Sequence, residues 1–408
     1  MPQLPIPETS PQQQKKWPKR LGKGILLSGA AALLLSIGWA YGQGKLSWHG
    51  FNSEKSDTAQ SIDYSSLDEV YKTLKSRYDG KLDSEAVMDG LKKGLAQATG
   101  DPYTEYLTPE EAKEFDEGLS GSFTGIGAEL GKEDDNIIIV SPISGFPAEQ
   151  AGLKPKDIIV AINDETVNDI SLSEAVKRIR GPKDTTVKLK VVRDGKPLDF
   201  EIKRDNITIP SVESKILEGN IGYLKISRFA EDTSSLSKKA AQEFKQAGVK
   251  GVILDVRGDP GGLLDTAVDV SSLWLPSGDT VLQEKRDNVV IKTYKSTGND
   301  ILEGIPTVVL IDEGSASASE IVAGALKDNG AATLMGAKTF GKGSVQQLER
   351  LPGGGVLKVT IARWYTPNGR NIDKEGIEPD QAVKISDEEA EAKKDPQKDA
   401  AINYIKTR

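Results

Sequence analysis

Three short loops hold the residues of this sequence whose types and spacing could support catalysis. The turn Pro260-Gly261-Gly262 leaves main-chain N–H groups uncovered, and such groups can donate hydrogen bonds to an oxyanion. The run 314–320 offers three serines just before an expected helix at 321–327, where the helix N-terminus would favour a nucleophile. Lys342 lies between two glycines in the third loop. Taken singly, the first two loops also have structural explanations, a tight turn and a helix cap.

The composition removes most other catalytic groups. The chain has no cysteine and one histidine, His49, so a thiol nucleophile, a Ser-His-Asp triad and thiolate or multi-histidine metal sites are excluded. A hydrolase of this composition needs Lys, Asp or Glu as its base. A phosphate-binding loop at Lys342 is rejected, because Gly343 stands where the magnesium-binding hydroxyl belongs. We therefore expect no metal and no cofactor. The net charge of −8 argues against nucleic acid as a partner.

The N-terminal region predicts export. A basic tail at 1–23 precedes the uncharged, apolar run 24–42, which as a helix would reach nearly 30 Å and span a bilayer. Basic residues before the span place the remainder outside the cytoplasm. A cleaved signal peptide is the alternative, because Ala40-Tyr41-Gly42 fits a small-x-small site. The chain is thus expected at the cell membrane with a single span, or secreted if the segment is cleaved.

The rest of the chain divides by its patterning. A polar linker at 43–63 leads to a helical region at 64–119, whose apolar stripes could pack on the core or form a dimer interface. Short strands follow at 120–204 and an alternating α/β core at 209–385. The charged segment 386–408, with a short apolar helix near 400–405, is expected to be a surface tail.

The strand and helix order at 120–204 resembles a PDZ domain, most specifically from Pro147 through Ile162. Such domains add an extended peptide as a strand and capture its terminal carboxylate in a backbone loop. By this resemblance, the capturing loop is Thr124, Gly125, Ile126 and Gly127, facing a helix that starts at Ser171.

Segments 314–329 and 339–346, with Pro260-Gly261-Gly262, Asp101-Pro102-Tyr103 and the run 365–370, resemble the carboxyl-terminal processing peptidases (tail-specific proteases). The likeness extends over about residues 65–385. It implies a multidomain α/β and β fold: a helical N-terminal arm, then a PDZ domain inserted before a crotonase-like α/β peptidase core. It also implies a serine-type endopeptidase that cleaves proteins near their C-termini.

The resemblance assigns roles that spacing alone could not, since Ser315, Ser317 and Ser319 are equivalent on spacing. It makes Ser317 the nucleophile and Lys342 the base, with N–H groups of Gly261 and Ala318 as oxyanion donors. Gln346 matches the third active-site position, and its offset of four fits one helical turn, from which it could hold the lysine. One departure is Asp259, where the family commonly has Asn.

The expected partners are proteins or peptides with free apolar C-termini, the membrane through the N-terminal segment, and a second copy of the chain. The PDZ domain either delivers tails or gates activity. Arg180 is a candidate latch by resemblance, although a solvated helix-end arginine is the simpler explanation. Two alternatives stay open: a non-catalytic PDZ scaffold with a degenerate peptidase core, and a different acyl-transfer enzyme on the same fold.

Overall fold

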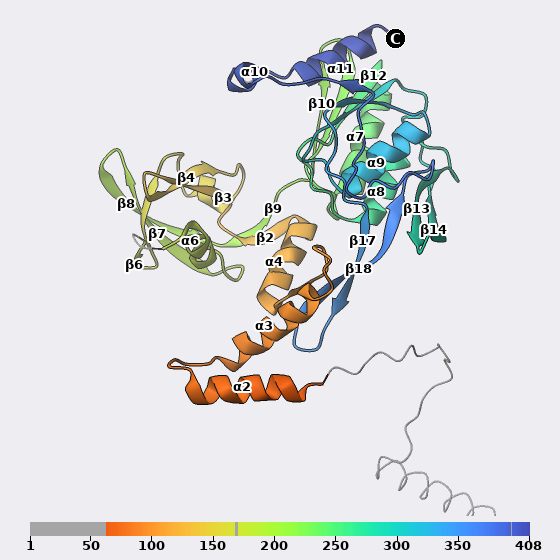
Figure 1. The fold of residues 1–408 in the computed structure, drawn as a ribbon. Helices are drawn as coiled ribbons and strands as arrows, with labels where there is room; N and C mark the ends of the chain where they lie inside the picture. Colours follow the sequence, from red (N-terminus) through yellow and green to blue (C-terminus); the bar gives the residue numbers. More distant parts are fainter. Residues whose placement is uncertain (1–62, 168–169, 393) are drawn as a thin grey trace, which may run out of the picture. The chain divides into compact units, whose positions relative to one another are not determined.

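The computed structural model describes residues 63–167, 170–392 and 394–408 (Figure 1). The basic tail, the predicted span at 24–42, His49 and most of the linker lie outside these residues. Within the described ranges, no helix is both long and apolar enough to cross a membrane.

The chain divides into two compact units, residues 1–81 and 82–408. In the first unit, helix α2 (Ser65–Arg77) carries the apolar stripe that the sequence predicts, and none of its residues is buried. Leu67, Val70 and Leu74 remain 42%, 58% and 42% exposed. An uncovered apolar stripe of this kind is what a helix presents to another helix.

The second unit begins with helix α3 (Ser84–Gln97), whose first turn is capped by the side chain of Asp83. Strand β1 (Glu105–Leu107) follows. Helix α4 (Pro109–Ser120) then starts with a capping box at Thr108. Both caps follow from the sequence, because Asp and Thr side chains accept hydrogen bonds from the free N–H groups of a first helical turn.

Strands β3 to β8 with helices α5 and α6 form the β-rich domain that the sequence predicts. Alternate strand residues point into one apolar cluster, among them Ile139, Ile159 and Leu189. The sheet order is β3-β4-β5-β7-β8, with β6 beside β5, so β3 is an edge strand, and α6 packs against it. The bounds are β3 (Ala128–Glu133), β4 (Asn136–Pro142), α5 (Pro147–Gln150), β5 (Ile158–Ile162), β6 (Glu165–Thr166), α6 (Leu172–Ile179), β7 (Thr186–Arg193) and β8 (Lys196–Lys203).

A short ribbon marks where the chain enters and leaves this domain. Strand β2 (Ser122–Gly125) pairs antiparallel with strand β9 (Asp205–Thr208). The domain is therefore an insertion between α4 and the larger core.

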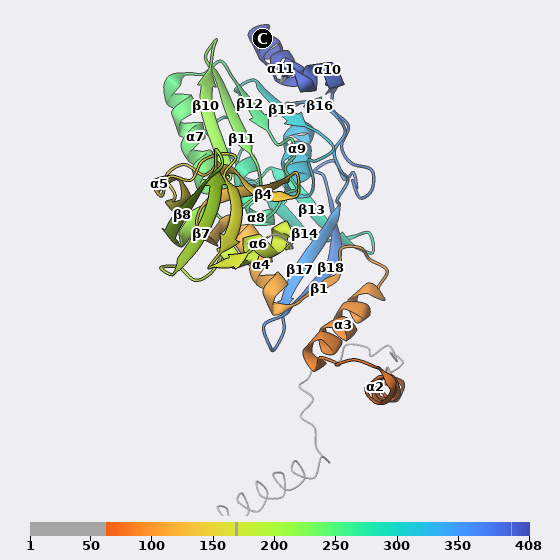
Figure 2. The ribbon, with the colours of Figure 1, turned by 90° about the vertical axis from the view of Figure 1, so that its left-hand side faces the viewer.

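The larger core is built on a six-stranded sheet of order β10-β11-β12-β15-β16-β19 (Figure 2). Its strands pair in parallel except at β10. Helices α7, α8 and α9 cover one face, where Val252 and Leu254 pack with Phe244 and Val322. The bounds are β10 (Val212–Leu217), β11 (Ile221–Ile226), α7 (Thr233–Ala247), β12 (Gly251–Asp255), α8 (Leu264–Ser271), β15 (Thr307–Ile311), α9 (Ala318–Asp328), β16 (Thr333–Gly336) and β19 (Gln381–Ala382).

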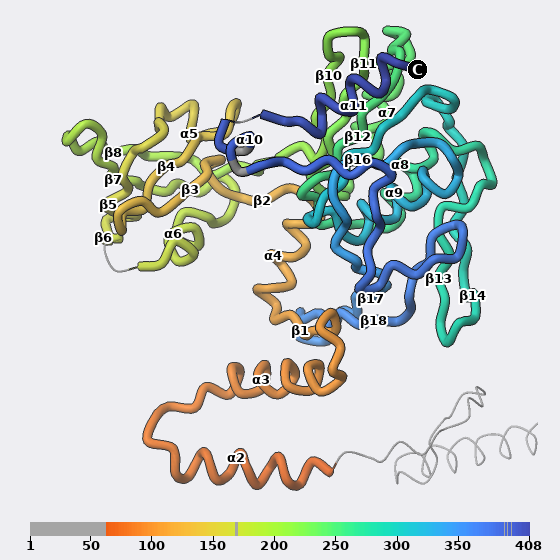
Figure 3. The backbone as a smooth tube through the Cα atoms, turned by 45° about the horizontal axis from the view of Figure 1, so that its top comes forward, coloured from red at the N-terminus to blue at the C-terminus, as the bar shows by residue number. Residues whose placement is uncertain are grey.

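A second sheet of order β1-β18-β13-β14, with β17 beside β18, completes the core (Figure 3). It includes β1 from the N-terminal arm, and Tyr106 of β1 is only 4% exposed. The arm after α3 is therefore part of the larger core. The bounds are β13 (Thr280–Arg286), β14 (Val289–Lys295), β17 (Ser344–Arg350) and β18 (Val356–Tyr365).

The C-terminal segment corrects one prediction. Instead of a surface tail, residues 386–408 include helix α10 (Asp387–Glu391) and helix α11 (Pro396–Lys406), and α11 packs on the sheet face opposite α7 to α9. Ala401 and Ile405 are buried there against Ile253 and Leu310. The segment's charge is high, yet its few apolar residues share one face of α11, and that face decides its position.

Candidate active site

The three candidate loops meet because their strands are parallel neighbours. Strands β12, β15 and β16 lie side by side in the sheet, and one candidate loop follows the carboxyl end of each. Carboxyl ends of parallel strands face the same edge of a sheet. Gly261, Ser317 and Lys342 accordingly line one pocket of about 470 Å³, most of whose other lining side chains are apolar.

The structure separates the three serines that spacing left equivalent. Ser315 is buried and its Oγ donates to the Val256 carbonyl at 2.8 Å. Ser319 is also buried and its Oγ donates to the Asp259 carbonyl at 3.0 Å. Both hydroxyls thus hold the loop to its neighbour, whereas Ser317 lines the pocket.

Ser317 has a strained backbone at the start of helix α9. Its φ of 55° and ψ of −112° lie outside the regions that a residue with a Cβ normally adopts. Such strain persists only where surrounding contacts enforce it, and it concentrates at functional sites. Ser317 also precedes the first helical turn, whose free N–H groups favour negative charge beside the hydroxyl.

Lys342 is half-buried in the loop between β16 and β17. Burial lowers the pKa of its amine, and the nearby cation Lys358 lowers that pKa further, while Glu105 and Glu320 act in the opposite direction. Trp364 anchors the loop by donating its indole N–H to the Lys342 carbonyl at 3.0 Å. Among the described hydrogen bonds, none joins the Lys342 amine to the Ser317 hydroxyl. The two groups share the pocket without a direct bond.

Gln346 lies in the same pocket, but the predicted helical turn between it and Lys342 is wrong. Ser344–Arg350 form strand β17, which pairs with β18 with a register shift between Val345 and Gln346, so the segment that leads from Lys342 to Gln346 is not helical. Its side-chain amide donates to the Ser344 hydroxyl at 2.6 Å. A four-residue offset fits both a helix and a strand, and the pairing with β18 is a long-range contact that local spacing does not report.

Glu320 connects the serine loop, which holds Ser317 between β15 and α9, to the lysine loop, which holds Lys342 between β16 and β17. The sequence did not lead us to predict this role for Glu320. The fully buried carboxylate accepts the N–H of Ser317 at 2.8 Å, of Gly341 at 2.8 Å and of Lys342 at 2.9 Å. It also accepts the Thr339 hydroxyl at 2.6 Å. Burial raises the pKa of Glu320, and these four donors oppose that rise. The signal for it was available as the S-x-x-E spacing of a capping box.

The two expected oxyanion donors lie next to each other. A Cβ added to Gly261 would sit 2.9 Å from the Ala318 nitrogen and 2.8 Å from the Ser317 Cβ, so only glycine allows this approach. The Gly261 φ of 98° also favours glycine. Its N–H, however, already donates to Asp259 Oδ1 at 2.8 Å.

Two further side chains reach the site from distant segments. Lys358 of β18 lines the pocket and forms an ion pair with Glu105 of β1. Tyr103, in the turn before β1, lies under the Lys342 amine, which is 5.2 Å from its ring centroid. The sequence offered no local signal for either contact, because both depend on the pairing of β1 with β18.

The predicted peptide-binding loop is only partly a loop. Thr124 and Gly125 belong to β2 and pair with Asn206 and Asp205. Ile126 is buried, and Gly127 has a φ of 73° before β3 begins. These residues therefore lead into the edge strand β3, against which α6 packs.

Arg180, the candidate latch, is not simply solvated. It ends helix α6, and its guanidinium donates to Glu117 of α4 at 3.0 Å. The guanidinium also lies 4.7 Å from the Phe123 ring centroid. Lys177 and Glu110 form a second ion pair between the same two helices at 2.6 Å.

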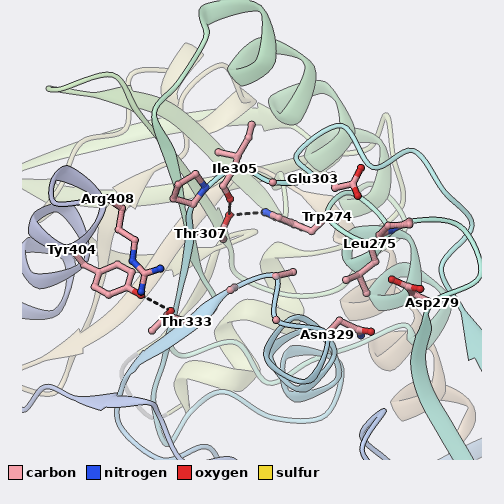
Figure 4. A pocket seen from close by; sticks show the side chains of 16 residues that line it. Trp274, Leu275, Asp279, Glu303, Ile305, Thr307, Asn329, Thr333, Tyr404 and Arg408 are labelled. Atoms are coloured by element: carbon pink, nitrogen blue, oxygen red, sulfur yellow. Dashed lines mark hydrogen bonds between the residues drawn. The ribbon is translucent and has the colours of Figure 1, made fainter.

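A separate pocket of about 540 Å³ lies at the opposite end of the sheet strands (Figure 4). It is lined at the amino ends of β15 and β16, where Trp274 donates to the Thr307 hydroxyl at 2.8 Å. Thr333 and Tyr404 share a hydrogen bond of 2.9 Å there. None of the candidate catalytic residues lines this pocket.

Comparison with known proteins identifies two domain families in this chain. Peptidase family S41 matches residues 220–383, and a PDZ domain matches residues 124–203. The carboxy-terminal processing protease CtpA of Bacillus subtilis is 40% identical over 335 residues, which are 82% of this chain and 72% of that protein. A "Probable CtpA-like serine protease" of Staphylococcus aureus is 42% identical over 322 residues, 78% of this chain and 64% of that protein.

The fold is shared with a solved structure of an S41 protease candidate from Bacteroides fragilis. The TM-score is 0.51 at 16% sequence identity, and the match covers 83% of this chain and 92% of the other. At that identity the likeness concerns the fold alone. From its relatives and its two matched domains, the chain belongs to peptidase family S41, among the carboxy-terminal processing proteases.

Proposed function

We propose that this protein is a serine endopeptidase that cuts proteins near their C-termini by a Ser-Lys mechanism, with Ser317 as nucleophile and Lys342 as base. The observation that supports the proposal most is the shared pocket: a strained serine at a helix start, a half-buried lysine with a lowered pKa, and the Gly261 turn line the same cavity. Within the described residues no histidine competes for the role of base.

The reaction follows from the chemistry of these groups. A neutral Lys342 amine takes the proton of the Ser317 hydroxyl as its oxygen attacks a peptide carbonyl. The N–H of Ala318 and the Gly261 turn stabilise the oxyanion that forms. The protonated amine then gives its proton to the leaving amine, and water releases the acyl group from Ser317. Gln346 provides a polar side chain in the pocket that Lys342 lines.

The lysine must lose its charge before it can act. Its ordinary pKa is about 10.4, so only a small fraction is neutral near pH 7 unless the site lowers that value. Burial and the Lys358 cation both act in the required direction. We expect activity to rise with pH as the amine deprotonates.

The PDZ domain recognises the free apolar C-terminus of the substrate. Edge strand β3 beside α6 offers the place where an extended tail can be added, after the turn at Gly127. The Arg180–Glu117 and Lys177–Glu110 ion pairs connect the domain to α4 and are candidates for contacts that a bound tail changes.

The catalytic part works outside the cytoplasm, anchored through the apolar run 24–42. The exposed apolar stripe on α2 supports a homodimer formed through the N-terminal helices. Because the chain has no cysteine, one introduced at an exposed site gives a unique label for a membrane-impermeant maleimide in intact cells. Labelling only after lysis would contradict export.

Peptide hydrolysis tests the catalytic proposal. Ser317→Ala and Lys342→Ala should abolish cleavage of an unfolded protein such as casein while both variants stay folded. Lys338→Ala removes an exposed lysine of the same loop and should retain full activity. Mass spectrometry of the products should place the cuts near free C-termini, and amidated peptides should be cut more slowly. Full activity in Lys342→Ala would refute the mechanism.

A further inference from the structure

Asp259 is an unexpected neighbour for a site where negative charge is to form. Its side chain is fully buried directly before the Pro260-Gly261-Gly262 turn. Oδ1 accepts the Gly261 N–H at 2.8 Å. Oδ2 is buried and has no hydrogen-bond partner among the described residues. An ionised carboxylate in this position would leave one charged oxygen without water or a donor, which is costly.

The main chain fixes Asp259 against the serine loop. Its carbonyl accepts the Ala316 N–H at 3.0 Å and the Ser319 hydroxyl at 3.0 Å. These bonds hold the main chain of Asp259 in place, and its side chain is held by the Gly261 N–H. It stays one hydrogen bond from Gly261, which in turn lies against Ser317 and Ala318.

The charged groups on the surrounding segments do not fully neutralise a carboxylate at Asp259. Arg228 is the cation whose field lowers the Asp259 pKa, but no ion pair joins the two among the described residues. Lys342 lines the pocket with Gly261, and Asp312 before helix α9 and Glu320 in its first turn accept main-chain N–H groups of their own. Burial dominates and raises the pKa of Asp259 to about 7, against the opposing Gly261 N–H.

We propose that Asp259 is a positioning residue. Its protonation state controls how well the Pro260-Gly261-Gly262 turn stabilises the oxyanion. The neutral carboxyl group holds Gly261 in place through Oδ1 and adds no charge. The ionised carboxylate forms a stronger hydrogen bond with the Gly261 N–H than the neutral group does. It also places a negative charge beside the developing oxyanion, which disfavours the reaction. Asp259 exchanges its proton with solvent before the reaction and takes no part in bond making. This inference rests on the proposed peptidase function.

The pH dependence of kcat/KM tests the inference in the full-length protein. The wild type should lose activity as pH rises through about 7, on top of the gain from Lys342 deprotonation. Asp259→Asn keeps an acceptor for Gly261 without a charge, so it should lack this loss and exceed the wild type by roughly tenfold or more at alkaline pH, since one oxyanion donor is typically worth more than that. Asp259→Ala removes the acceptor and should be slower at every pH.

Asp265→Asn is the matched control, because it removes the same charge from an exposed residue of the following helix α8. Its pH profile should follow the wild type. An alkaline loss that persists in Asp259→Asn would overturn the inference and leave the peptidase intact. Absence of Ser317-dependent hydrolysis at every pH would defeat the proposed function, and this inference with it.

Unfolding by urea gives a second readout that does not depend on activity. A carboxyl whose pKa is about 7 in the folded protein, and about 4 when unfolded, weakens folding as pH rises between these values. The urea midpoint of the wild type should therefore fall relative to that of Asp259→Asn across this window. Parallel midpoints would show that Asp259 is not held neutral and would also overturn the inference.

Discussion

The amine of Lys342 lies 5.2 Å from the ring centroid of Tyr103, a residue that precedes the whole PDZ domain in the chain. The ring is held there by backbone pairing, because β1 begins just after Tyr103 and pairs with β18. Thr104 locks the same turn: its hydroxyl donates to Asp101 at 2.6 Å and accepts the Thr360 N–H at 3.1 Å. The N-terminal arm therefore contributes to the environment of the lysine.

Tyr103→Ala should shift the rise of kcat/KM with pH to higher pH. The ring excludes water from the amine, which lowers the Lys342 pKa, and its π face attracts a cation, which raises it. Burial is the largest cause of the lowered Lys342 pKa. We therefore expect that removing the ring admits water to the amine and raises the Lys342 pKa, and that this effect exceeds the loss of the cation–π attraction. A rise of about one pKa unit would reduce the neutral fraction, and the rate near pH 7, roughly tenfold.

Tyr103→Phe is the control, because it keeps the ring and removes only the hydroxyl. It should follow the wild-type pH profile. An unshifted profile in Tyr103→Ala would show that the ring does not shield the amine.

Glu320→Ala should abolish activity and also destabilise the fold. Removing the carboxylate leaves the buried N–H of Gly341 and the partly buried N–H groups of Ser317 and Lys342 without their acceptor. Each such loss costs about 1–3 kcal/mol, so a fall of several kcal/mol in unfolding free energy is expected. Glu320→Gln keeps one acceptor oxygen and should lose kcat with less loss of stability. Urea unfolding and kcat measure the two effects.

Glu313→Ala is the matched control for Glu320, since Glu313 is exposed in the same loop. Its stability should stay within about 0.5 kcal/mol of the wild type, as for other surface substitutions. Comparable activity in Glu320→Ala and Glu313→Ala would contradict the role given to the buried carboxylate.

Gly261→Ala should reduce kcat by about 100-fold or more, the size of effect seen when an oxyanion hole is disturbed, because the turn beside the developing oxyanion is displaced. The new Cβ would meet the Ala316 carbonyl oxygen at 2.6 Å and the Ser317 Cβ at 2.8 Å, so the turn must move away from the nucleophile.

Gly258→Ala is the control that separates the effect of this clash from the effect of placing an alanine at a positive φ. Gly258 has a similar positive φ of 67°, but a Cβ there meets no atom within 4 Å. It should cost about 1 kcal/mol of stability and little kcat.

Strands buried on both faces were the most predictable part of the fold. Segments 221–226 and 307–311 form β11 and β15 within the α/β core that the sequence predicts at 209–385. Such strands read as unbroken apolar runs, which local sequence shows directly. The PDZ pattern was equally clear because its strands alternate and helix α6 has its cap, Ser171, in the sequence. Comparison with relatives confirmed the family and the order of the two matched domains.

The contacts that complete the site were less accessible from sequence. Ser317 and Lys342 were predicted through family resemblance, and the structure adds a geometric reason, the burial of Ser315 and Ser319. Tyr103 reaches the Lys342 amine, and Lys358 reaches the pocket, only through the pairing of β1 with β18, which joins segments separated by the whole PDZ domain. No local pattern encodes such a pairing, because β1 has only three residues and its partner is set by the global topology.

Ile405→Ala should show that the C-terminal helix stabilises the core. Ile405 is 4% exposed and packs on the sheet with Ile253 and Leu310, so truncation to Ala should cost about 2–4 kcal/mol. Asn403→Ala, on the exposed side of the same helix, should change stability by less than about 0.5 kcal/mol. Denaturant midpoints of the two variants give the comparison. Equal midpoints would show that residues 396–406 behave as a surface tail. If α11 did not stabilise the core, shortening its buried side chain would not lower the stability of the protein.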